Sequence, residues 1–334
     1  MPAYFGLDIG SSSIKLAHID GKKVNALGIA NNTLGKNVME MTNPERIGLV
    51  ESLKVLMKDS GVRSKQVVAS IPESLVYSRV LKFPFMSTPE LATAIKWELD
   101  QTVPFPPNEI EVSWVVLQKP ERATGAEKIS VYVVAVPTKI SDIYTNLLEL
   151  AGIEPVRLEN EVPAISRVFS PNLTDANPGL IMNIGAAGTS LVLSGKDILY
   201  GNYYVPVGGS ALTKFIADSF NLPITQAESY KRTYGMSKEQ LEGKVFSVLK
   251  PIVDNLLSEV KKMIIAFQNE NKGGTVSRII LTGGGSYLIG LVPYISENIA
   301  NIEVVIGDVF AGLPVNEKYK GLGPVFDVAC GLSV

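Results

Sequence analysis

Two segments, one in each half of the chain, follow the same pattern of residue types. Residues 7–15 read Leu-Asp-Ile-Gly-Ser-Ser-Ser-Ile-Lys, and residues 182–190 read Met-Asn-Ile-Gly-Ala-Ala-Gly-Thr-Ser. Each copy predicts a strand, a polar residue before a glycine turn, and a second strand, and each leads on to a Gly-Lys turn at 21–22 or 195–196. This internal repeat predicts a chain built from two similar lobes.

Both turns are suited to hold phosphate, because successive backbone N–H groups in such turns point into one concavity. Lys15 would add a positive charge, and Asp8 would hold Mg²⁺ through water. The alternative interpretation is that Lys15 is a strand lysine facing solvent and that Asp8 caps the turn. The candidate phosphate contacts are Gly10, Ser11, Ser12, Ser13 and Lys15 in the first turn, and Gly185, Ala186, Gly188 and Thr189 in the second. Two facing turns would hold one nucleotide between the lobes.

Two further glycine segments follow in the second half. One opens a predicted helix after residue 207, and the other, at 282–286, reads Thr-Gly-Gly-Gly-Ser after a buried strand. Glycines let a planar group or a phosphate approach the backbone, although a flexible loop is the alternative interpretation. The spacing matches neither a Rossmann fingerprint nor a P-loop. The candidate binding residues here are Gly208, Gly209, Gly283, Gly284, Gly285 and Ser286.

A predicted helix carries Glu228, Lys231 and Arg232 on neighbouring positions of one face. This face could hydrogen-bond ribose hydroxyls and place a guanidinium on an adenine ring. From spacing alone, an ion pair on the helix surface is the favoured interpretation.

Composition excludes several classes of protein. The chain has 46% hydrophobic and 19% charged residues and a formal net charge of -2, so no basic excess favours binding to nucleic acid or to an anionic membrane. Cys330 is the single cysteine and His18 the single histidine, which excludes an intrachain disulfide and any histidine triad that does not use His18. No apolar stretch approaches the roughly 20 residues of a membrane span. We expect a cytoplasmic protein without direct membrane insertion.

Periodicity predicts an α/β chain with an insertion. Helices are predicted at 44–60 and 141–151 and from about residue 250, and a turn-rich stretch at 169–178 marks the boundary between the lobes. The insertion contains a helix with Thr88 as its N-cap, two strands at 111–117 and 129–136, and a polar loop at 118–128 between them. The closing apolar run at 329–332 is interpreted as strand-like.

At this point the residues resemble the actin-like ATPase superfamily. Asp8–Lys15 is similar to its first phosphate motif and Asn183–Thr189 to its second. Leu281–Ser286 resembles its adenosine motif, and Glu228–Arg232 resembles the helix that contacts ribose and adenine in the chaperone branch.

Within this superfamily the chain is most similar to the PilM family of type IV pilus assembly proteins. The segments that carry this resemblance are Phe5–Lys15, Leu81–Met86, Thr102–Phe105, Gly152–Pro155 and Val207–Thr213. The resemblance implies an actin-like ATPase fold, with two lobes built from duplicated ribonuclease-H-like subdomains and an inserted subdomain of the type shared by PilM and FtsA.

This fold class predicts four subdomains. Subdomain IA, the first lobe, would comprise residues 1–77 and 138–175, and the inserted subdomain IC residues 78–137. Subdomain IIA, the core of the second lobe, would comprise residues 176–224 and 276–334, and the helical subdomain IIB residues 225–275.

The resemblance also implies a function. PilM-like proteins bind ATP with Mg²⁺ and capture the N-terminal cytoplasmic peptide of PilN, an inner-membrane protein. The implied protein is a cytoplasmic scaffold, held at the inner membrane by its partners, that connects membrane components, other pilus components and motor ATPases. Its peptide groove would lie between the first lobe and the inserted subdomain.

One departure from the superfamily pattern bears on catalysis. The second phosphate motif usually begins with aspartate, and here Asn183 stands in that position. An amide donates a hydrogen bond but cannot neutralise a metal ion. Glu161 stands where some relatives place a hydrolytic carboxylate and is a weak candidate for that role. We therefore expect nucleotide binding with slow or absent hydrolysis.

Three alternatives remain open from the sequence. A small-molecule kinase of the same superfamily would need a substrate base, and no clear base is visible. An FtsA-like division protein usually ends in an amphipathic membrane helix. A self-polymerising filament protein is the third. The sequence does not decide whether the machine is a pilus, a secretion system or a DNA-uptake system.

Overall fold

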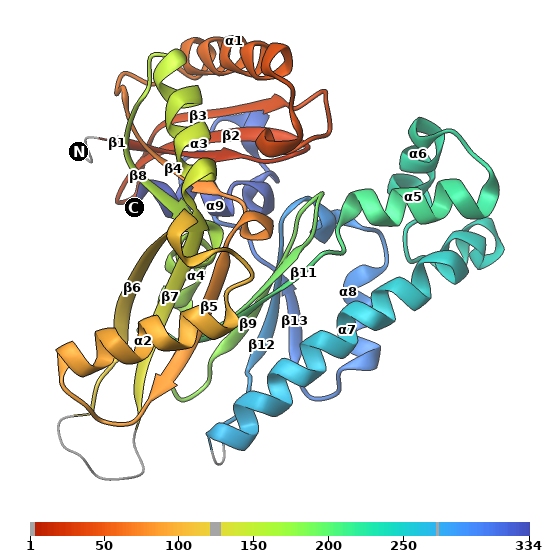
Figure 1. Cartoon of the computed structure of the whole chain (residues 1–334). Helices are drawn as coiled ribbons and strands as arrows, with labels where there is room; N and C mark the ends of the chain where they lie inside the picture. Colours follow the sequence, from red (N-terminus) through yellow and green to blue (C-terminus); the bar gives the residue numbers. More distant parts are fainter. Residues whose placement is uncertain (1–3, 121–127, 272–273) are drawn as a thin grey trace.

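Two five-stranded sheets and one three-stranded sheet form the framework of the computed structural model, which describes residues 4–120, 128–271 and 274–334 (Figure 1). The first sheet has the order β3-β2-β1-β4-β8 and the second the order β11-β10-β9-β12-β13. The strands of the first are β1 (Tyr4–Ile9), β2 (Ser13–Asp20), β3 (Lys23–Asn31), β4 (Gln66–Ile71) and β8 (Glu154–Asn160). Those of the second are β9 (Gly179–Ile184), β10 (Thr189–Ser194), β11 (Leu199–Val205), β12 (Arg278–Thr282) and β13 (Glu303–Ile306).

The two five-stranded sheets share one topology. In the first sheet, β1, β2 and β3 form an antiparallel meander, and β4 and β8 extend the sheet parallel to β1. In the second sheet, β9, β10 and β11 form the same meander, and β12 and β13 extend it parallel to β9. The predicted duplication is therefore confirmed, and each repeated turn joins the first two strands of its own sheet.

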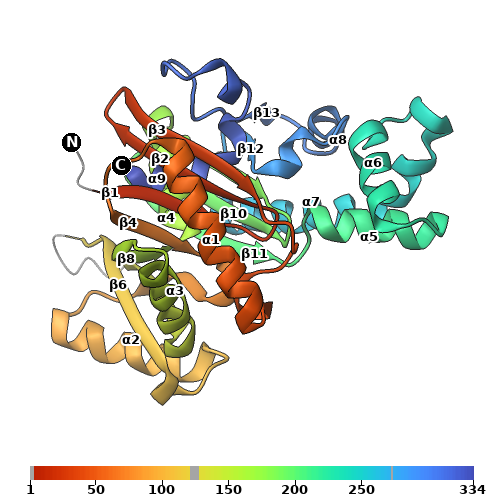
Figure 2. The same ribbon diagram turned by 90° about the horizontal axis from the view of Figure 1, so that it is seen from above.

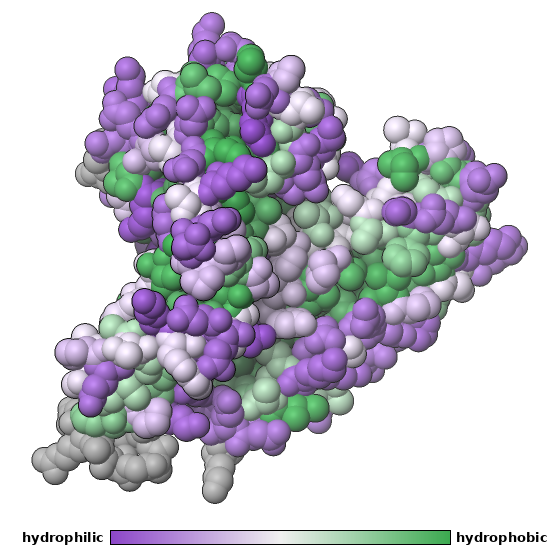
Figure 3. All heavy atoms as spheres, in the orientation of Figure 1, coloured by the Kyte–Doolittle hydropathy of each residue, from purple (hydrophilic) through white to green (hydrophobic). Residues whose placement is uncertain are grey.

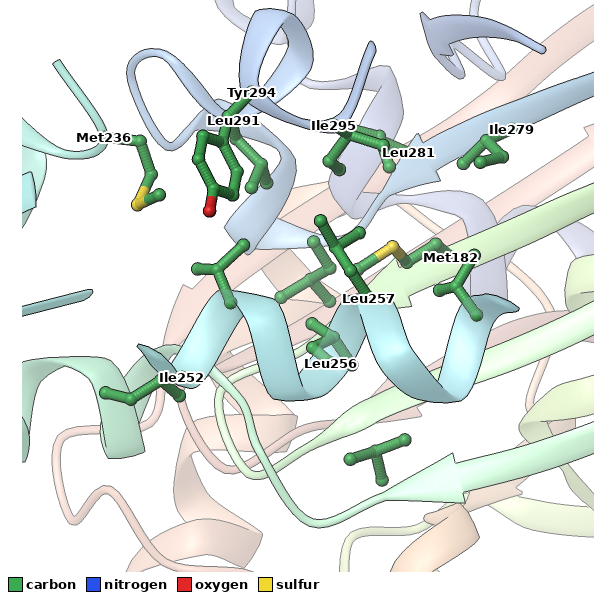
Figure 4. Close-up of a cluster of buried hydrophobic side chains, with 14 of the residues drawn as sticks. Met182, Met236, Ile252, Leu256, Leu257, Ile279, Leu281, Leu291, Tyr294 and Ile295 are labelled. Carbon is green, nitrogen blue, oxygen red and sulfur yellow. The ribbon is translucent and has the colours of Figure 1, made fainter. Parts of the chain in front are cut away.

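Helices cover the outer faces of both sheets. In the first lobe these are α1 (Asn43–Ser60) and α3 (Thr138–Leu150), and Figure 2 shows both beside the first sheet. In the second lobe, α7 (Lys244–Glu270) and α8 (Leu291–Asn298) lie beside the second sheet, while α5 (Gly209–Phe220) and α6 (Ile224–Tyr234) pack on α7 and form an arm that projects away from the sheet (Figure 1). Helix α7 begins six residues before the predicted start. Its apolar side chains recur at helical spacing, and Figure 4 shows Leu257 on the side of the helix that faces Met182 of β9 and Leu281 of β12.

The insertion forms the three-stranded sheet and one helix. Its sheet has the order β5-β7-β6, with β5 (Tyr77–Phe83), β6 (Ile110–Gln118) and β7 (Ile129–Pro137), and α2 (Thr88–Thr102) packs against it. The N-cap of α2 is Ser87 and not Thr88, because Ser87 forms a capping box with Glu90. Residues 121–127 of the predicted loop lie outside the described part. The predicted division into four subdomains stays a prediction.

Two short helices, α4 (Glu161–Phe169) and α9 (Asp327–Ser333), pack against each other between the two five-stranded sheets. Helix α4 follows the first sheet but contacts β9 and β10, and α9 follows the second sheet but contacts β1, β2 and β4. The strand-like interpretation of residues 329–332 is therefore wrong. Alternating patterns do not distinguish a short buried strand from a helix that is buried on every side, and every residue of α9 is buried.

Glycines allow these helices their close approach. A Cβ on Gly331 would overlap the Ala164 carbonyl oxygen of α4, and a Cβ on Gly6 would overlap the Ala329 carbonyl oxygen of α9. The backbones pack directly against each other at these points, so the lobes meet along a rigid seam. In the described part of the chain, no helix is long and apolar enough to cross a membrane.

A glycine-to-alanine pair tests this seam. We expect Gly331→Ala to lower the free energy of unfolding by about 2 kcal/mol or more, because the methyl group collides with backbone that cannot rotate away. The control is Gly48→Ala in the middle of α1, where a Cβ meets no heavy atom within 4 Å. There alanine should raise stability by up to about 1 kcal/mol, because it favours the helix. Urea unfolding measures both, and equal effects would contradict a close-packed seam.

Candidate functional site

The two repeated turns have the same hydrogen-bonded shape. In the first, the Gly10 N–H donates to the Ser13 carbonyl oxygen at 3.1 Å, and in the second the Gly185 N–H donates to the Gly188 carbonyl oxygen at 2.8 Å. Each turn follows the first strand of its sheet, and Figure 3 shows the molecule hollowed between the first lobe and the arm that carries α5 and α6. The repeat seen in the sequence is thus a repeat in backbone geometry.

Lys15 lies over the first turn and does not face solvent. Its Nζ is 2.9 Å from Asp8 Oδ2, its side chain is 14% exposed, and it is 3.4 Å from the position a Cβ would take on Gly10. Asp8 also accepts a hydrogen bond from the Ser70 hydroxyl at 3.1 Å. The cation and carboxylate predicted for phosphate and metal therefore stand side by side at the turn.

The second turn is joined to the start of α5. The Gly209 N–H donates to the Gly185 carbonyl oxygen at 2.9 Å, and the Ser210 N–H donates to the Ala186 carbonyl oxygen at 3.0 Å. A Cβ on Gly208 would lie 2.6 Å from both carbonyl oxygens. The structure thus brings together two glycine segments that are separated in the sequence.

The triple-glycine segment packs against the end of β9. Gly283 has φ of +73°, which favours glycine, and a Cβ there would lie 2.6 Å from the Ile184 carbonyl oxygen. A Cβ on Gly285 would overlap the Ile184 side chain, whereas one on Gly284 would meet nothing within 4 Å. A 3₁₀ turn over residues 284–287 follows, and α8 begins at Leu291. Gly284 is the member of the three that faces open space.

Two candidate hydroxyl groups are already engaged within the protein. The buried Thr189 hydroxyl donates to the Val207 carbonyl oxygen at 2.7 Å, and the buried Ser286 hydroxyl donates to the Gly283 carbonyl oxygen at 2.7 Å. They shape the two turns. By contrast, Ser11, Ser12 and Ser13 are partly or fully exposed at the first turn.

On the candidate face of α6 the structure shows the ion pair that the spacing favoured, and the contact with ribose and adenine stays a prediction. Glu228 is paired with Lys231 and Arg232, each at 2.7 Å, as a surface ion pair would be. Lys231 also donates to the Gly209 carbonyl oxygen at 2.9 Å, which ties the helix to the start of α5. Burial raises the pKa of Glu228, but hydrogen bonds from Lys231, Thr213 and Arg232 outweigh it and lower the pKa to about 2. Glu228 therefore stays charged at the edge of the cleft.

A group of carboxylates lies where the two lobes meet. Glu161, at the start of α4, is within hydrogen-bonding reach of the Glu73 N–H at 3.4 Å and of the Ser190 hydroxyl at 3.5 Å. Burial, together with the negative charges of Asp8, Glu73 and Asp327, raises its pKa to about 8. Carboxylates whose pKa is raised by burial and by like charges are typical of functional sites.

Sequence reasoning missed Asp327, the first residue of α9. The buried carboxylate accepts a hydrogen bond from Asn183 Nδ2, and the Thr282 hydroxyl lies 3.1 Å from the same oxygen. Burial raises its pKa to about 6, against the effect of these hydrogen bonds. Asn183, the departure from the superfamily pattern, is thus paired with a carboxylate on another element.

Sequence reasoning also missed Glu73, which follows β4. Its buried carboxylate accepts hydrogen bonds from Ser78 of the inserted subdomain, from Asn160 at the end of β8 and from Asn202 of β11. Burial raises the pKa of Glu73. An isolated glutamate after a strand carries no signal in the sequence, because its partners lie 5, 87 and 129 positions away.

No direct metal cage is present among the residues that the structure describes, since no three His, Cys, Asp or Glu side chains gather in a metal-binding arrangement. The role predicted for Asp8 is a water-mediated one, and it stays a prediction.

Duplicated sheets with matching turns around one cleft, crossed by two helices at its base, define the actin-like ATPase fold. The family model of the type IV pilus assembly protein PilM matches residues 6–334. The chain belongs to this family.

Solved structures agree with this assignment. The chain is similar to a structure described as a PilM-PilN type IV pilus biogenesis complex, with 26% sequence identity, a TM-score of 0.84, and coverage of 99% of this chain and 97% of that chain. It shares the fold of the ethanolamine utilization protein EutJ from Carboxydothermus hydrogenoformans, at 17% identity and a TM-score of 0.59, covering 99% and 88%. It also shares the fold of MreB5 of Spiroplasma citri bound to ADP, at 11% identity and a TM-score of 0.54, covering 98% and 94%.

The raised pKa of Glu161 predicts a dependence of stability on pH. The unfolded chain loses this proton near pH 4.5 and the folded protein near pH 8, so the charge costs the folded state free energy as the pH rises through that window. As the pH rises from 5 to 8, we expect the free energy of unfolding of Glu161→Gln to increase relative to that of the wild type, by about 1.4 kcal/mol for each pH unit.

Urea unfolding at each pH, without metal or nucleotide, measures this trend. The same replacement at Glu149, exposed in α3, controls for the loss of one charge. If the difference in free energy of unfolding between Glu161→Gln and the wild type stays constant with pH, the raised pKa of Glu161 is contradicted.

Proposed function

We propose that this protein is an ATP-binding scaffold of a type IV pilus assembly complex at the inner membrane. The observation that carries the proposal is the pair of turns with the same hydrogen-bonded shape, one in each lobe, with Lys15 over the first and the glycines at 208–209 and 283–285 beside the second. Close backbone packing at these glycines leaves a surface without side chains, which suits a phosphate chain and a planar base.

The residues present fit a nucleotide with Mg²⁺. The first turn and Lys15 would hold terminal phosphates, Asp8 would hold the metal through water, and Gly284 with the α6 face would receive the adenosine. The metal would neutralise phosphate charge. We propose slow or absent hydrolysis, because Asn183 stands where the superfamily carries an aspartate and an amide cannot neutralise a metal ion.

The partner we propose is the N-terminal cytoplasmic peptide of a PilN-like membrane protein. The similar structure named for a PilM-PilN complex supports this partner. The protein would then be cytoplasmic and held at the inner membrane through that peptide, with motor ATPases and other pilus components as further partners. A related secretion or DNA-uptake machine would use the same arrangement.

Exposed valines support a peptide groove between the first lobe and the inserted subdomain. Strand β8 is the edge of the first sheet and β6 the edge of the three-stranded sheet. Val115 of β6 and Val156 of β8 are each 54% exposed. Val115 pairs with Tyr132 of β7, whose side chain is buried in one cluster with Val68 of the first lobe. An extended peptide with apolar side chains fits such a pair of edges.

Nucleotide binding is tested at Gly284, where a side chain can be added without a clash. We expect Gly284→Asp to weaken binding of ATP with Mg²⁺ by about tenfold or more, which is 1.4 kcal/mol, because its carboxylate repels the nucleotide. Gly284→Asn adds the same volume without the charge and should weaken binding less. Isothermal titration calorimetry measures both. Wild-type affinity in Gly284→Asp would contradict this site.

Peptide capture is tested with synthetic N-terminal peptides of PilN-like proteins encoded nearby, titrated by fluorescence anisotropy with and without ATP. We expect Val115→Glu to weaken binding by about tenfold, because it places a charge in an apolar groove. The control is Val55→Glu on α1, where the valine is 57% exposed and away from the groove. Equal binding by the two variants would contradict the groove.

A further inference from the structure

Asp327 connects the two lobes, because its helix packs on the first sheet and its carboxylate is hydrogen-bonded to the second. Its helix, α9, packs against β1, β2 and β4 of the first sheet. Its carboxylate instead accepts a hydrogen bond from Asn183 at the end of β9 in the second sheet. The Thr282 hydroxyl, at the end of β12, lies 3.1 Å from the same oxygen and 2.8 Å from the Pro324 carbonyl oxygen. Asp327 is 2% exposed, so these contacts are made without competing water.

The duplicated lobes place related side chains at the same positions. In the first sheet, Leu7 pairs with Ala69, and the next residues along β1 and β4 are Asp8 and Ser70, which are joined by a hydrogen bond of 3.1 Å. In the second sheet, Asn183 pairs with Thr282 at the equivalent strand ends. One lobe therefore carries a carboxylate and a hydroxyl, and the other carries an amide and a hydroxyl.

The carboxylate on α9 explains why the second lobe carries an amide at position 183. An aspartate at position 183 would place two carboxylates within hydrogen-bonding distance of each other in a buried site, which is unfavourable unless a proton is shared. An asparagine donates to Asp327 and satisfies it. The second lobe thus has its carboxylate on the helix that crosses from the other lobe.

We propose that Asp327 is the positioning residue of the second phosphate turn, with Asn183 as its obligatory amide partner. Asn183 is two residues before Gly185, so the Asp327 carboxylate fixes the start of the second phosphate turn against α9. The spacing between the two phosphate turns is set through this contact. The proposal rests on the proposed nucleotide site for its effect on binding, but not for the pairing itself.

A reciprocal exchange tests the pairing in the full-length protein. Asn183→Asp should lower the melting temperature and weaken binding of ATP with Mg²⁺ by about tenfold or more, because it opposes two buried carboxylates. Asp327→Asn leaves two amides that still hydrogen-bond, so its effect should be smaller. The double variant N183D/D327N restores an amide–carboxylate pair with reversed polarity and should recover most of both quantities. Asn172→Asp, at an exposed position, makes the same chemical change and should alter neither.

Melting temperature without nucleotide and calorimetric titration with ATP and Mg²⁺ are measured separately. Recovery of both in the double variant supports the proposal, since loss of packing alone would add the two defects. A double variant no better than Asn183→Asp, or an Asn183→Asp protein that matches the wild type, overturns it. If the wild type binds no ATP, the proposed nucleotide site fails, and recovery of the melting temperature still decides the pairing.

Discussion

The contact between α4 and α9 is the constraint on which the rest of the structure depends. Each helix follows one sheet in the chain and packs on the other, so the two lobes are held by an exchange of elements. The elements approach closely because Gly331 and Gly6 have no side chain that would separate their backbone from the neighbouring backbone. The same two helices begin with Glu161 and Asp327, and this places their carboxylates at the base of the cleft. The packing that joins the lobes thereby also positions the acidic groups of the site.

The base of the cleft is held by polar contacts that satisfy buried charge. Asp8 is paired with Lys15, and Asp327 is satisfied by Asn183. The described hydrogen-bond partners of Glu161, the Glu73 N–H and the Ser190 hydroxyl, carry no positive charge. Burial and the nearby carboxylates therefore raise its pKa.

The inserted subdomain is connected to this site through Glu73. The carboxylate of Glu73 binds Ser78 of β5 and Asn202 of β11, and its backbone N–H lies at Glu161. The seam between the insertion and the second lobe therefore meets Glu161 at one residue.

The sequence by itself determined the duplication, the turns and most helices, because these depend on local spacing that is visible along the chain. It predicted Gly10, Gly185 and Gly283 as parts of one site. It could not predict that residues 329–332 are helical, because a segment buried on every side has no period to detect. Nor could it find Asp327 or Glu73, or explain Asn183, because their partners come from elements far apart in the chain. Only the tertiary structure decided the roles of these residues. A buried carboxylate is stabilised only by the hydrogen-bond donors that the packed helices and sheets bring close to it.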